Sequence, residues 1–405
     1  MKLGIPLVGF MDWGGGIDFL RIILKGLHAV REKYQLEIFV LIPEPVKKNK
    51  LDFIKLQIKK AINFISFSKR FETNYPVHQI ESIQARLLKE TQLEFLFYSQ
   101  TPNALENLCS QNKIEVIIPS FFNLGKDFKT PWVGYIPDFQ HKYYPEFFSK
   151  REFKIRDGIF SKYLDDTYSM IVNAQAVKQD IHKFYTHFKG EVFALPFCPL
   201  YNNQTPASHT DISHFKLPPK YFLISNQFWK HKDHATAFKA LAKFIQDGNT
   251  DVFLVCTGSM SDYRFPDYIN YLKALIEELG IKDQLFLLGY ILKEEQKEIM
   301  KNAIAVIQPT LFEGGPGGGA VYEALAIGVP VLMSDIAVNK EIKSPIAHFF
   351  QTGNELDLAI KMKEMLSVSH LNPDSFQEMQ SKETLALGEQ LMRAAFSAIS
   401  YVKKT

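Results

Sequence analysis

The chain has 405 residues, of which 46% are hydrophobic and 22% charged, so two or three globular domains are possible. Its 47 basic residues nearly balance 44 acidic ones, which argues against a nucleic-acid-binding protein and against an acidic halophile. The 3 cysteines form no C-x-x-C pair, so we expect buried, reduced thiols in a cytoplasmic protein.

The amino-terminal sequence MKLGIPLVGFMDWGGG predicts a first strand over residues 3–10. A signal peptide is not expected, because proline, aspartate and glycine interrupt the short apolar run. Gly14, Gly15 and Gly16 then precede an apolar helix predicted over 17–27. Glycines between a strand and a helix can bring free N–H groups to an anion, while a tight turn without a ligand is the alternative.

Residues 46–71 are strongly basic, with a single acid at Asp52 and isoleucines at helical spacing. Such a face could bind anionic lipid and give peripheral contact with the inner face of the cell membrane. An ordinary surface helix packed on its own sheet is the alternative. No run of eighteen apolar residues occurs, so no transmembrane helix is predicted.

Further strands of the first half are predicted over 36–42, 116–119, 132–136 and 170–173, with helical patterns between them. Asp138 and His141 follow one of these strands, at the end where ligands of doubly wound sheets bind. Either side chain could act there as a general base. A lone histidine is more often structural, so which of the two acts is open.

Residues 199–219 are rich in proline, asparagine, serine and threonine, and they predict a linker between a first domain, 1–198, and a second domain, 220–385. Strands of the second domain are predicted over 221–225, 252–257, 285–288, 305–308 and 330–333. The clearest helix starts at Pro266 and stops at Gly280. Two such domains should leave a cleft between their sheet ends, where ligands bind.

A glycine-rich turn, 313–319, connects the strand 305–308 to a helix predicted from Ala320. Its glycines permit close backbone approach, and the helix end offers free N–H groups with partial positive charge, so a pyrophosphate suits it. Glu323 could accept hydrogen bonds from ribose hydroxyls, and Glu313 would lie nearer a sugar. A flexible loop with a solvated glutamate is the structural alternative.

Two other phosphate-binding loops fit this turn less well. No Gly-Lys-Ser or Gly-Lys-Thr follows the glycines, which excludes the Walker type. Gly315, Gly317 and Ala320 satisfy the spacing of a dinucleotide fingerprint, but that motif normally opens the first β-α-β unit of a domain. An NAD-dependent oxidoreductase therefore stays as the alternative function.

The sequence PTLFEGGPGGGAVYEALAIGVPVLMSDIAVNKEI resembles the donor-site region of family 4 retaining glycosyltransferases, of the glycosyl transferases group 1 type. LISNQFWKHKDHATAFKALAKF resembles the start of that family's second domain, and FLLGYILKEEQKEIMKNAIAVIQPT includes its base-contacting loop. YIPDFQHKYYPEFF is similar to a signature of one bacterial branch. The resemblance implies the GT-B arrangement: two Rossmann-like doubly wound α/β domains facing each other across a cleft, acceptor domain first and donor domain second, with a carboxy-terminal helix, 386–405, crossing back.

By this resemblance Glu323 would hold the ribose and Glu313 would lie near the donor sugar, although nine residues separate the two where the family has seven. Lys232 matches a lysine that faces the diphosphate. The family's arginine position falls on the neutral Gln227, so Lys230 is the candidate for the second positive charge. The other donor-contacting candidates are Gly15, Gly16, Tyr290, Gly317, Gly318, Gly319 and Ala320. The catalytic candidates are Asp138, His141, Lys232 and Glu313.

The implied activity is retaining transfer of a sugar from a UDP- or GDP-sugar to a glycan or lipid-linked saccharide, in bacterial surface polysaccharide or lipopolysaccharide synthesis. We expect no cofactor and no metal, because no Asp-x-Asp occurs and the helix end and lysines can offset the phosphate charge. The family's usual order is His-Asp, whereas Pro137 precedes Asp138 here. The neutral Gln227 keeps a non-catalytic nucleotide-sugar-binding subunit as a further alternative.

Overall fold

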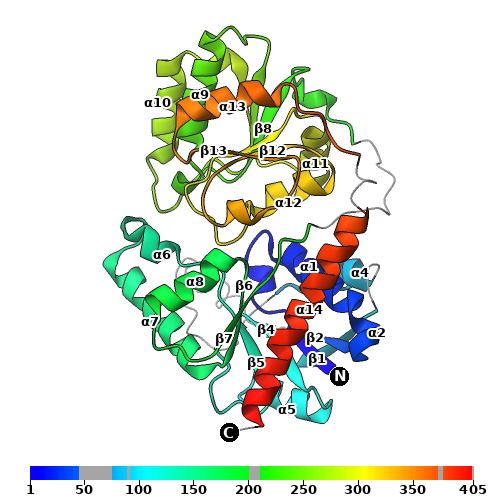
Figure 1. The fold of residues 1–405 in the computed structure, drawn as a ribbon. Coiled ribbons are helices and arrows are strands. Elements are labelled where there is room, and N and C mark those ends of the chain that lie inside the picture. Colours follow the sequence, from blue (N-terminus) through cyan, green and yellow to red (C-terminus); the bar gives the residue numbers. More distant parts are fainter. Residues whose placement is uncertain (45–74, 89–91, 200–209, 373–376, 404–405) are drawn as a thin grey trace. The chain divides into compact units, whose positions relative to one another are not determined.

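The structure is a computed structural model that describes residues 1–44, 75–88, 92–199, 210–372 and 377–403. The chain divides into two compact units, Met1–Cys198 with Ser381–Thr405, and Pro199–Gln380 (Figure 1). The predicted basic segment 46–71 lies outside the described residues. Among the helices that are described, none combines the length and the apolar character that a membrane span requires.

The first unit is built on a seven-stranded sheet with the order β3-β2-β1-β4-β5-β6-β7, and all neighbouring strands are parallel. The strands are β1 (Lys2–Pro6), β2 (Glu37–Pro43), β3 (Glu94–Tyr98), β4 (Val116–Ser120), β5 (Trp132–Tyr135), β6 (Ser169–Val172) and β7 (Glu191–Ala194). Every residue of the central strand β4 is buried, as expected for a parallel sheet covered by helices on both faces.

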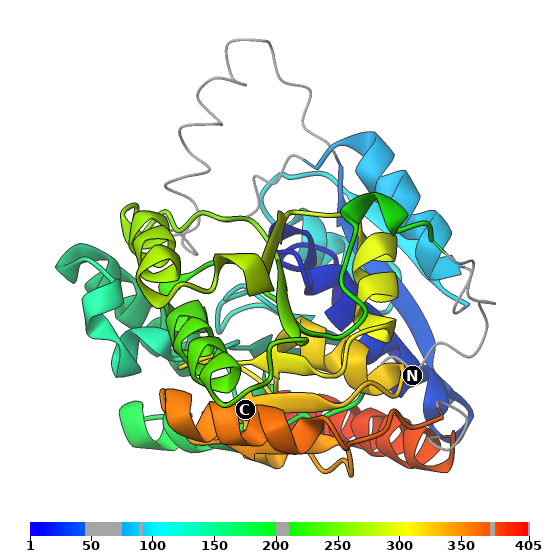
Figure 2. The ribbon, with the colours of Figure 1, turned by 90° about the horizontal axis from the view of Figure 1, so that it is seen from above.

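The described helices of this unit are α1 (Gly16–Ala29), α2 (Arg31–Tyr34), α4 (Val77–Leu88), α5 (Ala104–Gln111), α6 (Gln140–Tyr143), α7 (Lys150–Asp166) and α8 (Gln175–Phe184). The carboxy-terminal helix α14 (Gln377–Val402) lies beside α1 and α2 in both views (Figures 1 and 2). Its Leu387, Leu391 and Met392 are buried in the same core as α1. The helix therefore completes the first unit from the far end of the sequence.

Helices α1 and α14 approach closely at two glycines. A Cβ atom on Gly388 would lie 2.2 Å from the Gly26 carbonyl oxygen, and a Cβ on Gly26 would lie 2.8 Å from Leu387 Cγ. Both distances are shorter than a carbon atom tolerates, so the two helices can cross here only because neither position carries a side chain.

Replacement of Gly388 by valine is expected to lower the free energy of unfolding by about 1–3 kcal/mol, because the added side chain forces the two backbones apart. Urea unfolding measures the effect. Gly158→Ala is the matched control, since Gly158 lies in α7 with open space around its Cβ position. That change should stabilise the protein by up to about 1 kcal/mol. Equal effects of the two substitutions would contradict the close crossing of α1 and α14.

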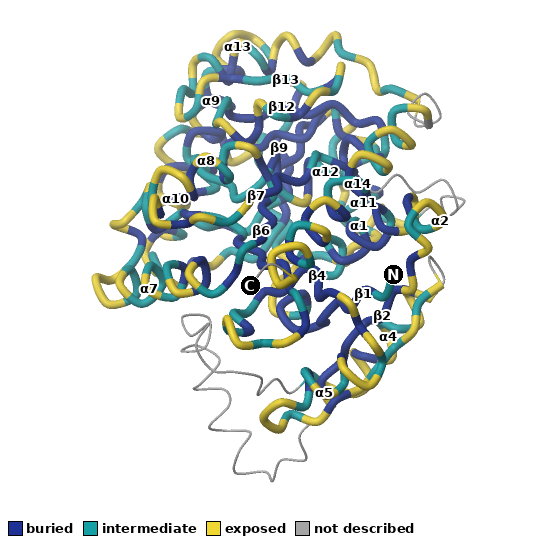
Figure 3. Tube along the Cα trace, turned by 60° about the horizontal axis from the view of Figure 1, so that its bottom comes forward, coloured by how far each residue is buried: buried dark blue, intermediate teal, exposed yellow. Residues whose placement is uncertain are grey.

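The second unit has a six-stranded parallel sheet with the order β10-β9-β8-β11-β12-β13. Its strands are β8 (Tyr221–Ser225), β9 (Phe253–Thr257), β10 (Leu285–Gly289), β11 (Val306–Gln308), β12 (Val331–Ser334) and β13 (Ala347–Phe350). Its described α-helices are α9 (His234–Gln246), α10 (Tyr268–Leu279), α11 (Lys293–Lys301), α12 (Gly318–Ala326) and α13 (Glu355–Met365). Figure 3 shows the central strands as mainly buried and the outer helices as more exposed, while the edge strand β10 is partly exposed along its length.

The two parallel sheets confirm the predicted fold class of two Rossmann-like α/β domains. In the second unit the predicted strands coincide with β8 to β12 to within one or two residues. The predicted helix is α10, and Gly280 ends it in the left-handed conformation with a φ of +63°. All three cysteines are buried and unpaired, as predicted.

Candidate functional site

The glycine-rich turn leads from β11 into α12, at the carboxyl edge of the second sheet. Gly317 and Gly318 have φ angles of +66° and +67°, in the left-handed region that favours glycine. A Cβ on Gly317 would also lie 2.5 Å from Val321 Cβ, whereas the Cβ position of Gly319 faces open space. The turn thus exposes the first backbone N–H groups of α12, where an anion is stabilised by the helix end.

Asn339 holds the glycine turn in place from the loop after β12. Its Oδ1 accepts a hydrogen bond from Gly317 N at 2.8 Å, and its Nδ2 donates to Ser334 O at 2.9 Å. The side chain is fully buried. Ser334 Oγ in turn donates to Thr310 O at 2.5 Å, which ties the same loop to the end of β11. These hydrogen bonds connect the turn to the loop after β12 and to the end of β11.

Lys232 and Glu313, two predicted site residues far apart in sequence, meet beside this turn. Lys232 Nζ lies 2.5 Å from Glu313 Oε1, and the two side chains are 13% and 12% exposed. Gln308 Nε2 donates to the same Glu313 oxygen at 2.8 Å, and Asn226 Nδ2 donates to Gln308 Oε1 at 2.5 Å. A chain of polar contacts therefore fixes the Glu313 carboxylate from the ends of β8 and β11.

The backbone around Lys232 is attached to the loop that carries Glu313. His231 O accepts hydrogen bonds from Thr310 Oγ1 at 3.1 Å and from Leu311 N at 2.8 Å. Asp233 then adopts a φ of +52° and caps α9 through Thr236. The loop after β8 and the loop after β11 thus form one unit of structure, which explains why Lys232 and Glu313 are side by side.

The histidines on either side of Lys232 are core residues. His231 is buried, and burial, together with the charges of Lys232 and Arg264, lowers its pKa to about 2. The ring of His234 is fully buried and stacks on Phe228 at 4.0 Å, and burial lowers its pKa to about 3, with Lys232 adding to the effect. Both rings are neutral at pH 7, so neither histidine adds a positive charge beside Lys232.

Buried neutral histidines make stability depend on pH. The folded-state pKa values of His231, His234 and His141 lie below the ordinary value of 6.5, so their contribution is complete above that pH. It is lost as the pH falls from 6.5 through the folded-state pKa values of about 4 for His141, about 3 for His234 and about 2 for His231, because the unfolded chain takes up protons that the folded chain cannot. Urea unfolding at pH 7.5 and pH 5 should show this loss. His234→Phe should make it smaller, and the exposed His78→Phe should leave it unchanged.

Gln227 and Lys230 contact the loop after β9. Gln227 Oε1 accepts a hydrogen bond from Ser259 N at 3.1 Å, which fixes the loop after β9. Lys230 Nζ lies over the ring of Phe265 at 4.4 Å. Sequence reasoning missed Arg264 in that loop, whose Nη2 is 3.2 Å from His231 Nδ1. No motif surrounds Arg264, so only the fold could have located it next to the Lys232 segment.

Glu323 projects from α12 and contacts the start of α11. Its Oε1 lies 2.5 Å from Lys293 Nζ, and the two side chains are 19% and 43% exposed. The second oxygen, Oε2, is buried and has no hydrogen-bond partner among the described residues. Tyr290 follows β10 at the same sheet edge and is 79% exposed. Glu323 therefore has one buried oxygen to which no described residue donates a hydrogen bond.

In the first unit, the predicted glycines lie between β1 and α1. A Cβ on Gly16 would lie 1.9 Å from Phe10 O, and one on Gly15 would lie 2.6 Å from the Trp13 ring, so steric crowding explains both. The Cβ position of Gly14 faces open space, and Trp13 is 45% exposed. Crowding therefore accounts for Gly15 and Gly16 but not for Gly14.

Asp138 and His141 have different surroundings in the first unit. Asp138 Oδ1 accepts hydrogen bonds from Gln140 N and from Arg156 Nη2, both at 2.8 Å, and the side chain is 24% exposed. His141 is fully buried, with the rings of Phe153 and Phe160 at 5.3 and 5.6 Å. Burial, reinforced by the charge of Arg156, lowers the pKa of His141 to about 4. Only Asp138 is accessible to a substrate.

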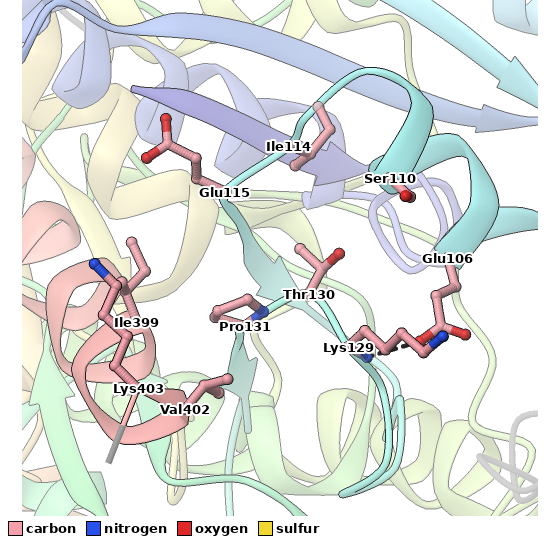
Figure 4. Close-up of a pocket in the computed structure, with 10 residues that line it drawn as sticks. All are labelled: Glu106, Ser110, Ile114, Glu115, Lys129, Thr130, Pro131, Ile399, Val402 and Lys403. Atoms are coloured by element: carbon pink, nitrogen blue, oxygen red, sulfur yellow. Dashed lines mark hydrogen bonds between the residues drawn. The ribbon is translucent and has the colours of Figure 1, made fainter. Parts of the chain in front are cut away.

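A pocket of about 390 Å³ lies elsewhere in the first unit, next to α5 and the end of α14 (Figure 4). Ile114 and Glu115 precede β4, and Thr130 and Pro131 precede β5, so the pocket is at the amino ends of these strands. Ligands of doubly wound sheets bind at the opposite edge. None of the predicted site residues lines it. Across the described residues, no three His, Cys, Asp or Glu side chains are grouped as a metal site would require.

Residues 208–377 match the family model of glycosyl transferases group 1. The matched segment makes up most of the second unit. The full chain is also similar in fold to the crystal structure of Anabaena HepE in complex with UDP and glucose, with a TM-score of 0.53 over 100% of this chain and 97% of that one. At 14% sequence identity this similarity shows the fold alone, which is GT-B.

Two relatives are similar to parts of the chain in sequence. An O-antigen chain mannosyltransferase, RfbU, of Salmonella typhimurium is 26% identical over 200 residues, which is 48% of this chain and 51% of that protein. An uncharacterized glycosyltransferase of Methanocaldococcus jannaschii is 29% identical over 123 residues, or 30% of this chain and 29% of that one. The chain thus spans about half or less of the length of these relatives.

Proposed function

We propose that the protein is a retaining, metal-independent glycosyltransferase that moves a sugar from a UDP- or GDP-sugar to a glycan or lipid-linked saccharide in bacterial surface polysaccharide synthesis. One observation carries the proposal: the largely buried ion pair of Lys232 and Glu313 lies beside the amino-terminal end of α12, one turn before Glu323. The match to the group 1 family model and the similarity to the Salmonella mannosyltransferase support the same class of enzyme.

Each group at this sheet edge suits one part of a nucleotide-sugar. The free N–H groups of Gly319 and Ala320, together with the helix dipole, would bind the diphosphate. The free Oε2 of Glu323 would accept a hydrogen bond from a ribose hydroxyl, and the exposed ring of Tyr290 is available to the base. Glu313 would accept hydrogen bonds from sugar hydroxyls, since Gln308 continues to hold it when Lys232 turns to the phosphate.

In the transfer step, the bond between sugar C1 and the β-phosphate oxygen breaks while the acceptor oxygen bonds to C1 from the same face. The proton of the acceptor hydroxyl passes to the leaving phosphate. Negative charge accumulates on that phosphate, and Lys232 and the amino-terminal end of α12 would stabilise it. In the first unit, Asp138 is the candidate that orients a sugar hydroxyl, because it is accessible and His141 is buried.

The NAD-dependent alternative has less support. The glycine turn follows β11, the fourth strand of its unit along the chain, whereas a dinucleotide fingerprint follows the first. Calorimetric titration with UDP-sugars, GDP-sugars and NAD separates the two classes. We expect binding of a sugar nucleotide without binding of NAD. Binding of NAD alone would overturn the proposal, and sugar-nucleotide binding without hydrolysis or transfer would favour a non-catalytic subunit.

A further inference from the structure

Helix α11 begins with a lysine at the position where helices favour acidic residues. Lys293 is its first residue, and the partial positive charge of a helix amino terminus disfavours a cation there. Glu294 and Glu295 follow, and Glu295 Oε2 accepts a hydrogen bond from Leu292 N at 2.9 Å. The acidic residues stabilise the start of the helix, so Lys293 needs another explanation.

Lys293 is explained by its contact with α12. Its Nζ lies 2.5 Å from Glu323 Oε1, while Glu323 Oε2 is buried without a hydrogen-bond partner among the described residues. An ionised carboxylate accepts through both oxygens, and a buried acceptor without a donor costs free energy. The lysine thus restrains the carboxylate by one oxygen and leaves the other for a donor that the protein does not supply.

Helix α11 is hydrogen-bonded to the sheet, which fixes the position of the Lys293 backbone next to Glu323. Gln296, one turn after Lys293, donates a hydrogen bond from Nε2 to Ser225 Oγ at the end of β8. Ser225 Oγ lies 2.9 Å from Thr257 Oγ1 at the end of β9. Helices α11 and α12 also pack against each other. The position of the Lys293 backbone relative to Glu323 is therefore set by the carboxyl edge of the sheet.

We propose that Lys293 is a positioning residue that fixes the Glu323 carboxylate so that Oε2 meets a ribose hydroxyl of the nucleotide. Lys293 thereby sets the preference of the site for ribonucleotides over nucleotides that lack the 2′- and 3′-hydroxyls. This inference rests on the proposed function, because it assigns a nucleotide to the site. It adds Lys293 to the site, a residue that lies outside the segment from Glu313 to Glu323.

The test compares UDP and GDP with their 2′,3′-dideoxy counterparts by calorimetric titration of the full-length protein. The wild type should bind the ribonucleotide it prefers about tenfold or more tightly than the matching dideoxynucleotide. Lys293→Ala should weaken ribonucleotide binding about tenfold and leave dideoxynucleotide binding nearly unchanged. Lys293→Arg should restore the preference, because it keeps a cation beside Glu323.

Lys301→Ala is the matched control, since Lys301 forms a 3.0 Å ion pair with Glu298 on the same helix. It should change neither affinity. The inference is overturned if Lys293→Ala leaves the ribose preference intact, or if it weakens both nucleotides equally, as a general loss of charge or structure would. If Glu323→Ala abolishes the preference while Lys293→Ala does not, the proposed function stands and this inference fails. If the wild type binds neither UDP nor GDP, both fail together.

Discussion

Lys232→Ala is expected to lower kcat for glycosyl transfer by about 100-fold to 1,000-fold, the usual loss when a donor that stabilises a developing negative charge is removed. Lys232 is the charged group at this site that lies beside both the glycine turn and Glu313, because its neighbours His231 and His234 are neutral. The effect should appear in kcat more than in the KM of the donor, since phosphate charge increases as the sugar bond breaks. Steady-state rates of nucleotide release measure it.

The substitution also leaves Glu313 buried without its cation, so part of any loss could reflect lower stability. Lys232→Arg tests for this, because it keeps the charge pair. Lys220→Ala is the second control: Lys220 forms an exposed ion pair with Asp251 in the same unit and should have no effect. A fully active Lys232→Ala protein, or equal losses in Lys232→Ala and Lys220→Ala, would show that Lys232 does not act on the phosphate.

Asp138→Asn is expected to lower kcat by about 100-fold or more, because it removes a charge that would orient a sugar hydroxyl. The asparagine keeps the size of the side chain and an oxygen that can accept from Gln140 N, so the local structure should persist. His141→Phe should leave kcat at the same order of magnitude, because this ring is fully buried among phenylalanines, with Asp157 Oδ1 3.6 Å from its Nε2.

Circular dichroism and thermal unfolding of the Asp138 and His141 variants show whether each remains folded. A folded His141→Phe protein without activity, beside an active Asp138→Asn protein, would reverse the assignment of the two residues. The two variants together therefore show which of Asp138 and His141 acts in catalysis, a question that the sequence around Pro137 leaves open.

Most of the fold could be predicted from the sequence because its central strands are buried on both faces. Runs such as those in β4 and β8 must be continuously apolar, and such runs are recognisable. The strands that were not predicted are β3, β7 and β13, which lie at the edges of the two sheets. An edge strand is covered on fewer sides. Buried and exposed residues therefore alternate less clearly in β3 and β13, and several of their residues are partly exposed.

The candidate site could be predicted only in part. The glycine turn, Glu313 and Glu323 are contiguous in sequence, and Lys232 matches a family position. The partners of these residues come from other elements: Gln308 and Asn226 hold Glu313, and Lys293 holds Glu323. A lysine at a helix start or a glutamine at a strand end belongs to no recognisable motif. These contacts can therefore be identified only in the folded chain, where the strand ends lie at one edge of the sheet.

For the histidines, the sequence suggests a role that their burial in the structure does not favour. A histidine beside a basic turn, or after a strand, suggests catalysis because imidazole can exchange protons near neutral pH. In the structure, burial among aromatic rings lowers the pKa values of His141 and His234 to about 4 and about 3. Burial is a property of the folded chain, and a single residue in a polar-looking segment does not reveal it.

Release of nucleotide from a panel of UDP- and GDP-sugars, by the wild-type protein and by Glu323→Ala and Lys220→Ala, is the most direct test of the proposed donor site. We expect release from at least one sugar nucleotide by the wild type, a large loss in Glu323→Ala, and wild-type rates in Lys220→Ala. Undiminished release by Glu323→Ala would contradict the assignment of the donor to the glycine turn and α12.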